Sequence, residues 1–456
     1  MPNSLNQKIE PIIGLEIHIE LQTKSKMFCS CYAEHFGKEP NTQTCPVCLG
    51  LPGALPVPNQ KAIEWTVLAG LALDGEIPLF SKFDRKNYFY PDLPKGYQIS
   101  QYDLPLAEKG KWKMDNGKWI RIKRVHLEED TAKLIHQFGM ENGKWKMENG
   151  NYTLIDFNRS GVPLMEIVTE PDLSSADEAK IFLQKLQQLV RYLAISEADM
   201  EKGQMRCEPT INLKISQKGK LFFTPLVEVK NINSFRFVQK AIDYEIQRQQ
   251  EEFERTGLEK QPGRKTTRGW DEKKQITVLQ REKEEAEDYR YFPEPDIPPI
   301  KWTKSQISNL KSQIGELPDE KKKRFVSQYK IPVQYGEILT ETKEKADYFD
   351  ETCRLAGKIP FEEIANVIVN KKADIEKLTP LELIKTLAKS KKQVSISDKE
   401  LSQVIDEILK ENSSAISDYQ NGKTTAIEFL VGQVARRTKG QADPNQTRKL
   451  LLEKLK

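Results

Sequence analysis

Two pairs of cysteines near the start of the chain constrain its fold more than any other feature of the sequence. Cys29-Ser-Cys31 and Cys45-Pro-Val-Cys48 form a CxC pair and a CxxC pair, with 13 residues between them. Two tight turns of this kind can place four thiolates around one Zn²⁺ ion in a tetrahedron. Four thiolates leave no open position for water, so the sequence predicts a structural zinc site and a reaction centre elsewhere. The alternative is a loop with four reduced thiols.

Length and composition exclude several classes of protein. A chain of 456 residues is long enough for about three domains. No apolar stretch approaches the ~20 residues of a membrane span, and the first eight residues lack the apolar core of a secretory signal. Six cysteines in so long a chain do not make a disulfide framework, so Cys207 and Cys353 are predicted to be buried small residues. We therefore expect a cytoplasmic protein without membrane contacts. The net charge of +4 does not by itself predict nucleic-acid binding.

Residues 11 to about 295 read as mixed strand and helix. Residues 12–21 alternate apolar and polar side chains, which is typical of a half-buried strand. The segments 110–117 and 143–150 nearly repeat the sequence Gly-Lys-Trp-Lys-Met-Asp/Glu-Asn-Gly. Asn-Gly steps favour tight hairpin turns, because both central positions need a positive φ. The sequence therefore predicts hairpin turns at 116–117, 142–143 and 149–150.

Two amphipathic helices are predicted in the same region. One begins at Ser175, which has the spacing of a capping box with Glu178, and apolar residues then recur at helical intervals. The other begins after Ser234. Residues 251–275 are charged and contain a Pro-Gly step, so they are predicted to form an exposed loop.

A proline-rich break at 293–299 separates this region from a Lys/Glu-rich remainder with helical patterns. We predict a first domain at 1–295, a helical domain at 296–392 and a small helical tail at 393–456. The tail carries a basic cluster at a helix end, formed by Arg436, Arg437 and Lys439. Such cations commonly complement the helix dipole, and contact with RNA phosphates is the alternative.

Three predicted strands each carry a carboxylate among apolar residues. Glu16 and His18 lie two residues apart on the first strand and share a face. The second strand follows a basic run and ends in His126-Leu-Glu-Glu-Asp130, and the third contains Glu166. Burying an ionised carboxylate is costly unless it is paired or bound to a cation. Carboxylates with one imidazole suit Mg²⁺ or Mn²⁺, and ordinary salt bridges are the alternative.

Residues 81–98 combine four cations, three tyrosines and several Pro or Gly residues. A loop of this composition can hold phosphates with Lys and Arg while tyrosines stack on a base. We therefore predict a binding loop there, with Arg85, Lys86, Tyr88 and Lys95 as candidate contacts. Two other signatures are missing: the glycines near 257–263 do not have P-loop spacing, and no serine-nucleophile segment is present.

Several long strings of this sequence resemble the B subunits of bacterial aspartyl/glutamyl-tRNA amidotransferases. The resemblance is dense over residues 11–300 and looser beyond. It is carried by the segments 14–18, 44–56, 82–101, 126–130, 228–237 and 288–295.

The resemblance implies a glutamine-synthetase-like α+β cradle with a mixed or antiparallel sheet, a helical domain and a helical tail. It implies a ligase that uses ATP to phosphorylate the side-chain carboxylate of Glu-tRNA(Gln) or Asp-tRNA(Asn). Ammonia from an amidase A subunit then forms the amide, and a small C subunit completes a heterotrimer. The missing serine-nucleophile segment agrees with that division of labour.

The resemblance also implies roles for individual residues. It implies a Mg²⁺ site at Glu16, His18, Glu129 and Glu166, with Glu128 beside it. Strand alternation alone turns Glu129 away, so this site requires a bend or bulge at the strand end. The same resemblance implies contacts with ATP or the tRNA acceptor end at Lys86 and Lys95, zinc at the four cysteines, and contact between the tail and the tRNA body.

The sequence departs from the family pattern in three places. Cys207-Glu-Pro-Thr210 replaces Cys-Asp-Ala-Asn, Gly269 replaces an arginine before Trp270, and a helical stretch between Leu387 and Ile396 is missing. The first two lie in the predicted cradle, and the third lies just before the predicted tail. Two other functions remain open: a zinc-stabilised RNA-binding scaffold, and a metallohydrolase that needs neither ATP nor partners.

Overall fold

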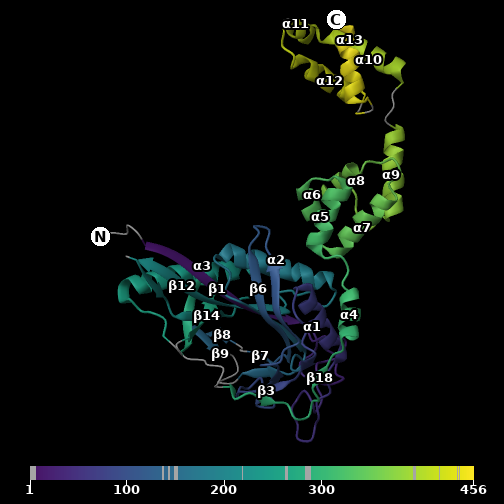
Figure 1. Cartoon of the computed structure of the whole chain (residues 1–456). Helices are drawn as coiled ribbons and strands as arrows, with labels where there is room; N and C mark the ends of the chain where they lie inside the picture. The colour runs from purple at the N-terminus through teal and green to yellow at the C-terminus, as the bar shows by residue number, and fades with distance from the viewer. Residues whose placement is uncertain are drawn as a thin grey trace. The chain divides into compact units, whose positions relative to one another are not determined.

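The computed structural model describes residues 7–135, 138–141, 144–147, 153–217, 219–261, 265–282, 289–393, 397–420, 422–438, 440 and 442–455. The chain divides into two compact units, Met1–Pro318 and Asp319–Lys456. Figure 1 shows the strands gathered in the first unit and a helical second unit. The predicted α+β class is therefore confirmed. The division at residues 295 and 392 stays a prediction.

A nine-stranded mixed sheet, counted over the described residues, organises the first unit. Neighbouring strands are antiparallel except β14 and β15, which run parallel. Strand β13 (Lys220–Phe223) adds to the end of β12. In order across the sheet the other strands are β16 (Ile276–Glu282), β15 (Lys265–Asp271), β14 (Leu226–Lys230), β12 (Met205–Gln217), β1 (Gln7–Glu20), β11 (Pro163–Thr169), β6 (Trp119–Glu129) and β5 (Ala107–Lys113).

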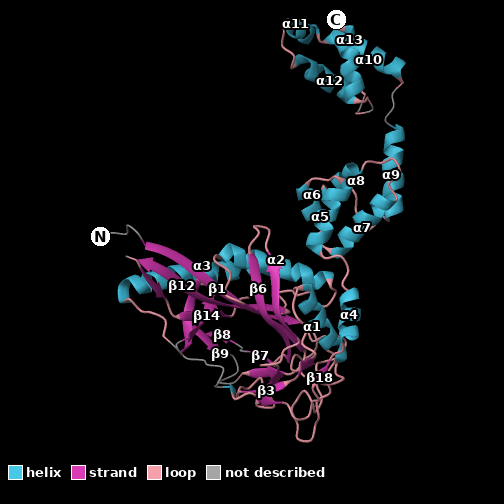
Figure 2. Ribbon diagram, viewed as in Figure 1, coloured by secondary structure: helices cyan, strands magenta, loops and turns pink. Residues whose placement is uncertain are grey.

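The two faces of this sheet differ in character because side chains alternate along each strand. In β1, Ile13, Leu15, Ile17 and Ile19 are fully buried in the apolar core. Helices α1 (Gln60–Ala72), α2 (Ala176–Tyr192) and α3 (Phe235–Thr256) contribute to that core, and Figure 2 shows α2 and α3 along one side of the sheet. Each fully buried aliphatic side chain contributes about 1.5–3 kcal/mol. The polar residues between them point to the opposite face, which we call the polar face.

Both predicted helices begin where the sequence indicates. Ser175 accepts a hydrogen bond from the backbone N–H of Glu178, and Ser234 accepts one from Phe237. The predicted loop over 251–275 is wrong in two parts, because α3 continues to Thr256 and β15 begins at Lys265. The last turns of α3 and one face of β15 are polar, so their hydrophobic signal is weak although their backbones are regular.

The first predicted hairpin is confirmed, since β5 and β6 pair around a turn in which Gly117 has a φ of 85°. Strands β8 (Phe138–Glu141) and β9 (Lys144–Met147) also pair, and the Asn-Gly steps at 142–143 and 149–150 lie outside the described residues. Strands β7 (Lys133–Ile135) and β10 (Leu154–Asp156) pair beside them.

Two small sheets and one helix complete the first unit. Strands β3 (Asp84–Asn87), β4 (Tyr97–Ser100) and β17 (Phe292–Pro293) form one sheet, and β2 (Phe80–Ser81) pairs with β18 (Ile300–Lys301). After the proline-rich break, α4 (Lys304–Ser312) packs on α1 and buries Leu310 in the core. The chain therefore rejoins the first unit beyond the break.

The second unit is helical throughout its described residues. Phe325, Tyr329 and Phe349 pack as an aromatic cluster, with ring centroids 5.0–5.7 Å apart. A separate apolar core joins the last four helices. In order, the helices are α5 (Pro318–Tyr329), α6 (Val333–Leu339), α7 (Lys343–Arg354), α8 (Phe361–Val369), α9 (Pro380–Gln393), α10 (Asp398–Glu411), α11 (Ser413–Gln420), α12 (Ala426–Arg437) and α13 (Pro444–Lys454).

In the part of the chain that the structure describes, every helix is too short or too polar to span a membrane.

Candidate active site

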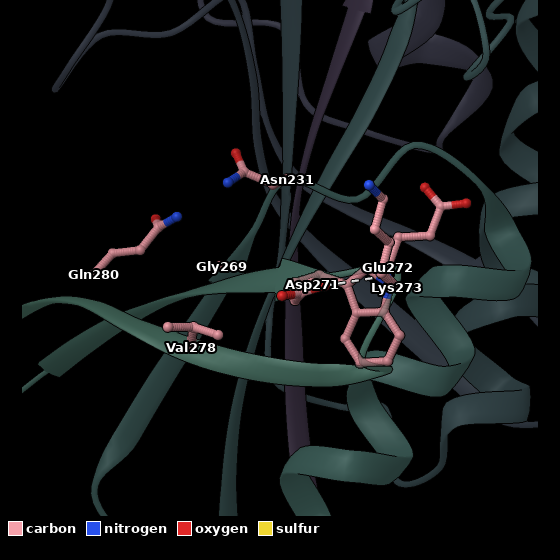
Figure 3. Close-up of a pocket in the computed structure, with 8 residues that line it drawn as sticks. Asn231, Gly269, Asp271, Glu272, Lys273, Val278 and Gln280 are labelled. Carbon is pink, nitrogen blue, oxygen red and sulfur yellow. Dashed lines mark hydrogen bonds between the residues drawn. The ribbon is translucent and has the colours of Figure 1, made fainter. Parts of the chain in front are cut away.

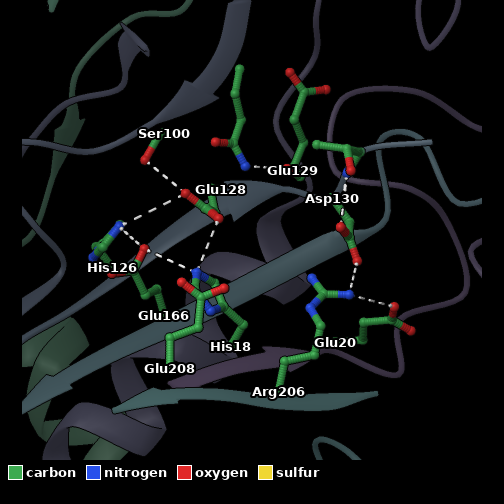
Figure 4. A network of polar contacts seen from close by, with 12 residues as sticks. His18, Glu20, Ser100, His126, Glu128, Glu129, Asp130, Glu166, Arg206 and Glu208 are labelled. Carbon is green, nitrogen blue, oxygen red and sulfur yellow. Dashed lines mark hydrogen bonds and ion pairs between the residues drawn. The ribbon is translucent and has the colours of Figure 1, made fainter. Parts of the chain in front are cut away.

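Three ligand-type side chains meet on the polar face where β1, β11 and β6 lie side by side. His18 pairs in register with Glu166, and Glu166 pairs with His126. One ligand atom each from His18, Glu128 and Glu166 lie within 4.8 Å of one another. Nε2 of His18 is 3.4 Å from Glu166 Oε2 and 3.8 Å from Glu128 Oε1 (Figure 4). We call these three residues the histidine group.

Neighbouring side chains hold this group in place. Nε2 of His126 is 3.1 Å from Glu166 Oε2, and its Nδ1 accepts a hydrogen bond from Arg124 Nε. In that arrangement Nε2 of His126 carries the proton and donates to Glu166. Ser100 donates a hydrogen bond of 3.1 Å to Glu128 Oε2. Ser100 and His126 therefore orient the two carboxylates, which also face His18.

The histidine group contains Glu128, where the predicted metal site has Glu129. The pairing of β6 with β11 is continuous from Arg124 to Glu129, so the bend that the predicted site requires is absent. Simple alternation then puts Glu128 on the face of His126 and turns Glu129 away. Glu129 Oε1 instead lies 2.6 Å from Lys95 Nζ and accepts a hydrogen bond from the Ile99 N–H.

A second acidic group lies beside the first on the polar face. Carboxylate oxygens of Glu16, Glu208 and Glu228, from β1, β12 and β14, lie within 4.8 Å of one another. Lys230 Nζ is 2.9 Å from Glu208, and Lys265 Nζ is 2.5 Å from Glu228. We call the three acids the glutamate group. Glu16 of the predicted set thus lies here, apart from His18 and Glu166.

Charged side chains in each group shift the pKa values of side chains in the other. Burial raises the pKa of Glu16 to about 7, and the carboxylates of Glu166 and Glu228 add to the rise. Burial alone would lower the pKa of His18, but its contact with Glu166 and the charge of Glu128 raise it to about 9. A proton on His18 therefore balances these carboxylates, at a place where a divalent cation could do the same.

A lysine from the predicted binding loop faces the histidine group. Burial opposes the charge of Lys86, yet the carboxylates of Glu128 and Glu166 raise its pKa well above its usual value. Its Nζ lies 5.1 Å from the ring centre of Tyr289 and 5.9 Å from that of Tyr88. Burial also raises the pKa of Tyr88. This arrangement keeps a cation and two aromatic rings together at the edge of the site.

The other predicted contacts of the loop have different partners. Lys95 pairs with Glu129, as described above. Arg85 forms a two-pronged pair with Glu294, with Nε–Oε2 and Nη2–Oε1 distances of 2.6 and 2.8 Å, and lies 4.4 Å above the Tyr97 ring. Its guanidinium ties β3 to the segment after β17.

The four cysteines meet as the sequence predicts. Their Sγ atoms lie within 4.8 Å of one another, and those of Cys45 and Cys48 are 3.9 Å apart. A zinc tetrahedron with ~2.3 Å bonds needs sulfurs about 3.8 Å apart, so this cysteine group fits such an ion. A hydrogen bond from the Cys29 thiol, aided by the nearby Lys26 ammonium, lowers the pKa of Cys48 to about 5 despite its burial. Lys26 is itself buried, and its Nζ donates to the carbonyls of Gln43 and Phe157.

A hollow of about 790 Å³ opens at Gly269 of β15, the residue that pairs with Lys230 of β14. Figure 3 shows the amide side chains of Asn231 and Gln280 on one side of this glycine. A Cβ at position 269 would lie 2.2 Å from Gln280 Nε2, so Gln280 uses the space that the missing side chain leaves.

Four residues of the polar face were not predicted from the sequence: Glu208, Glu228, Lys230 and Lys265. Glu208 and Thr210 alternate with buried Cys207 and Ile211, and Glu228 and Lys230 flank buried Val229. The period-2 pattern therefore carried a signal for their common face. That β12 pairs with β1, and that β14 and β15 follow beyond β12 in the sheet, is a long-range fact that this pattern does not contain.

The tail cluster is partly described. Arg436 is exposed at the end of α12, and Arg437 pairs with Glu411 at 2.5 Å. Lys439 lies outside the described residues.

Comparisons with known proteins all identify the same family. Residues 11–308 match a family model described as the GatB/GatE catalytic domain, and residues 354–455 match one described as the GatB domain. Three similar curated proteins are each named as the B subunit of an aspartyl/glutamyl-tRNA(Asn/Gln) amidotransferase. The protein from Carboxydothermus hydrogenoformans is 42% identical (98% of this chain, 99% of the relative). Those from Thermotoga petrophila (97% and 98%) and Thermomicrobium roseum (98% and 99%) are 43% and 44% identical.

Proposed function

Because this chain belongs to the family of B subunits of aspartyl/glutamyl-tRNA amidotransferases, we propose that it activates the side-chain carboxylate of a misacylated tRNA with ATP. It is a component of a ligase-type, tRNA-dependent amidotransferase. The substrates are Glu-tRNA(Gln), Asp-tRNA(Asn) or both. The setting is the cytoplasm, where these tRNAs are charged.

The reaction needs activation because a carboxylate oxygen is a poor leaving group. In the first step, an oxygen of the side-chain carboxylate attacks the γ-phosphorus of ATP, and the bond to ADP breaks. In the second step, ammonia attacks the carbonyl carbon, phosphate leaves with the former carboxylate oxygen, and the nitrogen loses a proton. Phosphoryl transfer of this kind depends mainly on positioning and on neutralising charge.

One observation carries the proposal: the histidine group and the glutamate group lie side by side on the same face of the sheet. His18, Glu128 and Glu166 would hold one divalent cation, and Glu16, Glu208 and Glu228 a second. Mg²⁺ or Mn²⁺ suits such ligands, and when bound it neutralises the phosphate oxygens of ATP. In this proposal Glu128 takes the place that the family resemblance assigned to Glu129.

The residues around the two groups have separate tasks in this proposal. Lys86 faces the carboxylates and would stabilise charge on the transferring phosphoryl group. Lys95, held by Glu129, would contact the phosphates of ATP or of the acceptor end. Tyr88 and Tyr289 confine Lys86 and offer ring faces to a base. Ser100 and His126 keep the carboxylates oriented.

The remaining parts of the assembly would come from outside this chain. Ammonia would be supplied by an amidase A subunit, and a small C subunit would complete a heterotrimer. The cysteine group would hold a structural Zn²⁺ ion. Arg436, Arg437 and Lys439 would contact the tRNA body.

The test is an amide-forming assay. The chain is purified with its amidase and small subunits and given Glu-tRNA(Gln) or Asp-tRNA(Asn), Mg²⁺ and glutamine, with and without ATP. Formation of Gln-tRNA(Gln) or Asn-tRNA(Asn) only with ATP is the expected result. If tRNA binds and no amide forms with either tRNA, even with free ammonia, the chain is an RNA-binding scaffold. Hydrolysis without ATP or partners would indicate a metallohydrolase.

A further inference from the structure

The loop that leaves the second cysteine pair touches the candidate active site through a glycine. Gly50 has a φ of +64°, and its backbone packs directly on Lys95. A Cβ at position 50 would lie 2.5 Å from Lys95 Cγ, 3.1 Å from its backbone N and 3.2 Å from its Cα. Two of these atoms belong to the backbone, which cannot swing aside as a side-chain end can. The loop can approach Lys95 this closely because glycine stands at position 50.

The ammonium end of Lys95 is held beside β6. Its Nζ is 2.6 Å from Glu129 Oε1, and its side chain is 14% exposed. The next residue back along β6 is Glu128 of the histidine group. The side chain of Lys95 therefore reaches from Gly50 to β6, the strand that carries the proposed cation ligand Glu128.

The backbone at Gly50 is hydrogen-bonded to the turn that carries Cys45 and Cys48. The Leu49 N–H donates to the Cys45 carbonyl at 3.0 Å, and the Gly50 N–H donates to the Val47 carbonyl at 3.0 Å. Both bonds close the turn that brings the Cys45 and Cys48 sulfurs together. From the other side, Ser160 donates a hydrogen bond to the Cys48 carbonyl. An ion that holds the four sulfurs would thus hold the turn that ends at Gly50.

We propose that the cysteine group positions Lys95. The metal-closed turn at Cys45–Cys48 presses the Gly50 backbone against Lys95 and keeps its ammonium at Glu129, next to Glu128 on β6. The phosphate contact of Lys95 rests on the proposed function; the mechanical link between the loop and the lysine does not. In this view the cysteine loop acts on the reaction by positioning Lys95, the residue that would contact phosphate.

Two glycines of the same loop make a matched pair for the test. Gly50 and Gly53 both have positive φ, at +64° and +83°, so alanine strains the backbone at either position. A Cβ at Gly53 meets no atom within 4 Å, whereas one at Gly50 meets Lys95. The variants Gly50→Ala and Gly53→Ala therefore differ in the contact with Lys95 and share the strain.

The first readout is the steady-state kinetics of the whole complex. Gly50→Ala is expected to lower kcat for ATP-dependent amide formation about 10- to 100-fold, the usual cost of misplacing a reactive group by about 1 Å. Gly53→Ala is expected to stay within about twofold of the wild-type chain. Zinc content, measured by elemental analysis, is expected to be equal in both. In a Lys95→Ala background, Gly50→Ala is expected to add much less than it does alone.

The second readout does not depend on activity. Lysine acetylation by acetic anhydride, followed by peptide mass spectrometry, reports how well Lys95 is shielded in the full chain. Gly50→Ala, or removal of the metal with a chelator, is expected to speed acetylation of Lys95 several-fold, with Lys82 as the internal reference. Gly53→Ala is expected to leave the rate unchanged.

The outcomes separate this inference from the proposed function. Equal kinetics and equal Lys95 labelling for Gly50→Ala and Gly53→Ala would overturn the inference while the wild-type chain still forms amide. If the wild-type complex forms no amide, the function is wrong, and the labelling pattern alone then decides whether the loop positions Lys95. Loss of zinc from Gly50→Ala with unchanged Lys95 labelling also overturns the inference.

Discussion

At the scale of single residues, the site depends on which of two adjacent glutamates faces the cations. His18, Glu166 and Lys86 were identified from the sequence, and the structure brings them to one place. Glu128 and Glu129 are both buried, and chemistry alone does not distinguish them. They are distinguished by the face of the sheet to which each points, because β6 keeps its register with β11 up to Glu129.

The first prediction compares these neighbours. Glu128→Gln removes one anionic ligand of the histidine group, and we expect it to abolish ATP-dependent amide formation. The rate should fall about 10³-fold or more, on the order seen when a key electrostatic group is removed. Glu129→Gln keeps the group intact and loosens Lys95, so a loss of about 10- to 100-fold is expected. Initial rates with Glu-tRNA(Gln) measure both, and glutamine hydrolysis by the amidase partner is the control. A greater loss in Glu129→Gln would restore the site that the family resemblance implies.

A second prediction concerns the cation facing the carboxylates. Lys86→Met keeps the length of the side chain and removes its charge, so kcat should fall about 10²- to 10³-fold. Lys82→Met is the control, because Lys82 lies in the same loop and is paired with Asp84 and Asp103. The ATP dependence of amide formation measures both variants. Equal effects would mean that Lys86 only stabilises the loop.

At the scale of elements, regular backbone extends further than the hydrophobic pattern indicates. The polar end of α3 and the strand β15 replace a predicted loop, and both border the polar face or its helix layer. Arg268 of β15 pairs at 3.1 Å with buried Glu245 of α3, so polar contacts join these elements. In the second unit, a buried acid has the same joining role between helices.

The third prediction follows from that acid, Asp350 of α7. Burial alone would raise its pKa, but hydrogen bonds from Arg324 and Tyr329 lower it below its usual value. A carboxyl whose pKa is lower in the folded state stabilises the fold above its unfolded pKa and loses this contribution as the pH falls through its folded pKa. Asp350→Asn should therefore reduce the free energy of unfolding at pH 7 by about 1–2 kcal/mol, with a shrinking difference below about pH 4.

Urea unfolding followed by circular dichroism measures this difference at pH 7 and at pH 3. All six tryptophans precede residue 303, so fluorescence would report the first unit instead. Asp418→Asn is the control, since Asp418 and its partner Lys423 are 51% and 68% exposed and such a pair contributes little. A difference between Asp350→Asn and the wild-type chain that is constant with pH would contradict the assignment.

At the scale of the whole molecule, the family resemblance stated from the motifs is confirmed by matches over residues 11–308 and 354–455. In the proposed function, the two units have different roles. The first carries the two acidic groups and the cysteine group, and the second ends in the helices that would contact the tRNA body. A contact that serves only substrate binding should affect KM more than kcat.

The fourth prediction tests that division. Arg436→Glu reverses an exposed charge at the end of α12, so KM for tRNA should rise about 3- to 10-fold with kcat unchanged, and the effect should shrink at high salt. Arg448→Ala, which removes a cation paired with Glu428 at 2.7 Å, is the control and should change KM little. Kinetics at two ionic strengths measure both. A change in kcat alone would place the tail's role outside tRNA binding.

The sequence by itself determined the class of the fold, the cysteine group and the membership of the family. The mixture of strands and helices and the cysteine group follow from local information: alternation along β1, caps at Ser175 and Ser234, and two short cysteine spacings. Family membership follows from long matching segments such as 82–101. Tertiary structure decided which carboxylates meet. The glutamate group joins β1 to β12 and β14, two strands that are close to each other in sequence and far from β1, and strand register decides that Glu128 joins His18. Pairing over such separations depends on packing of the whole sheet, and no local pattern encodes it.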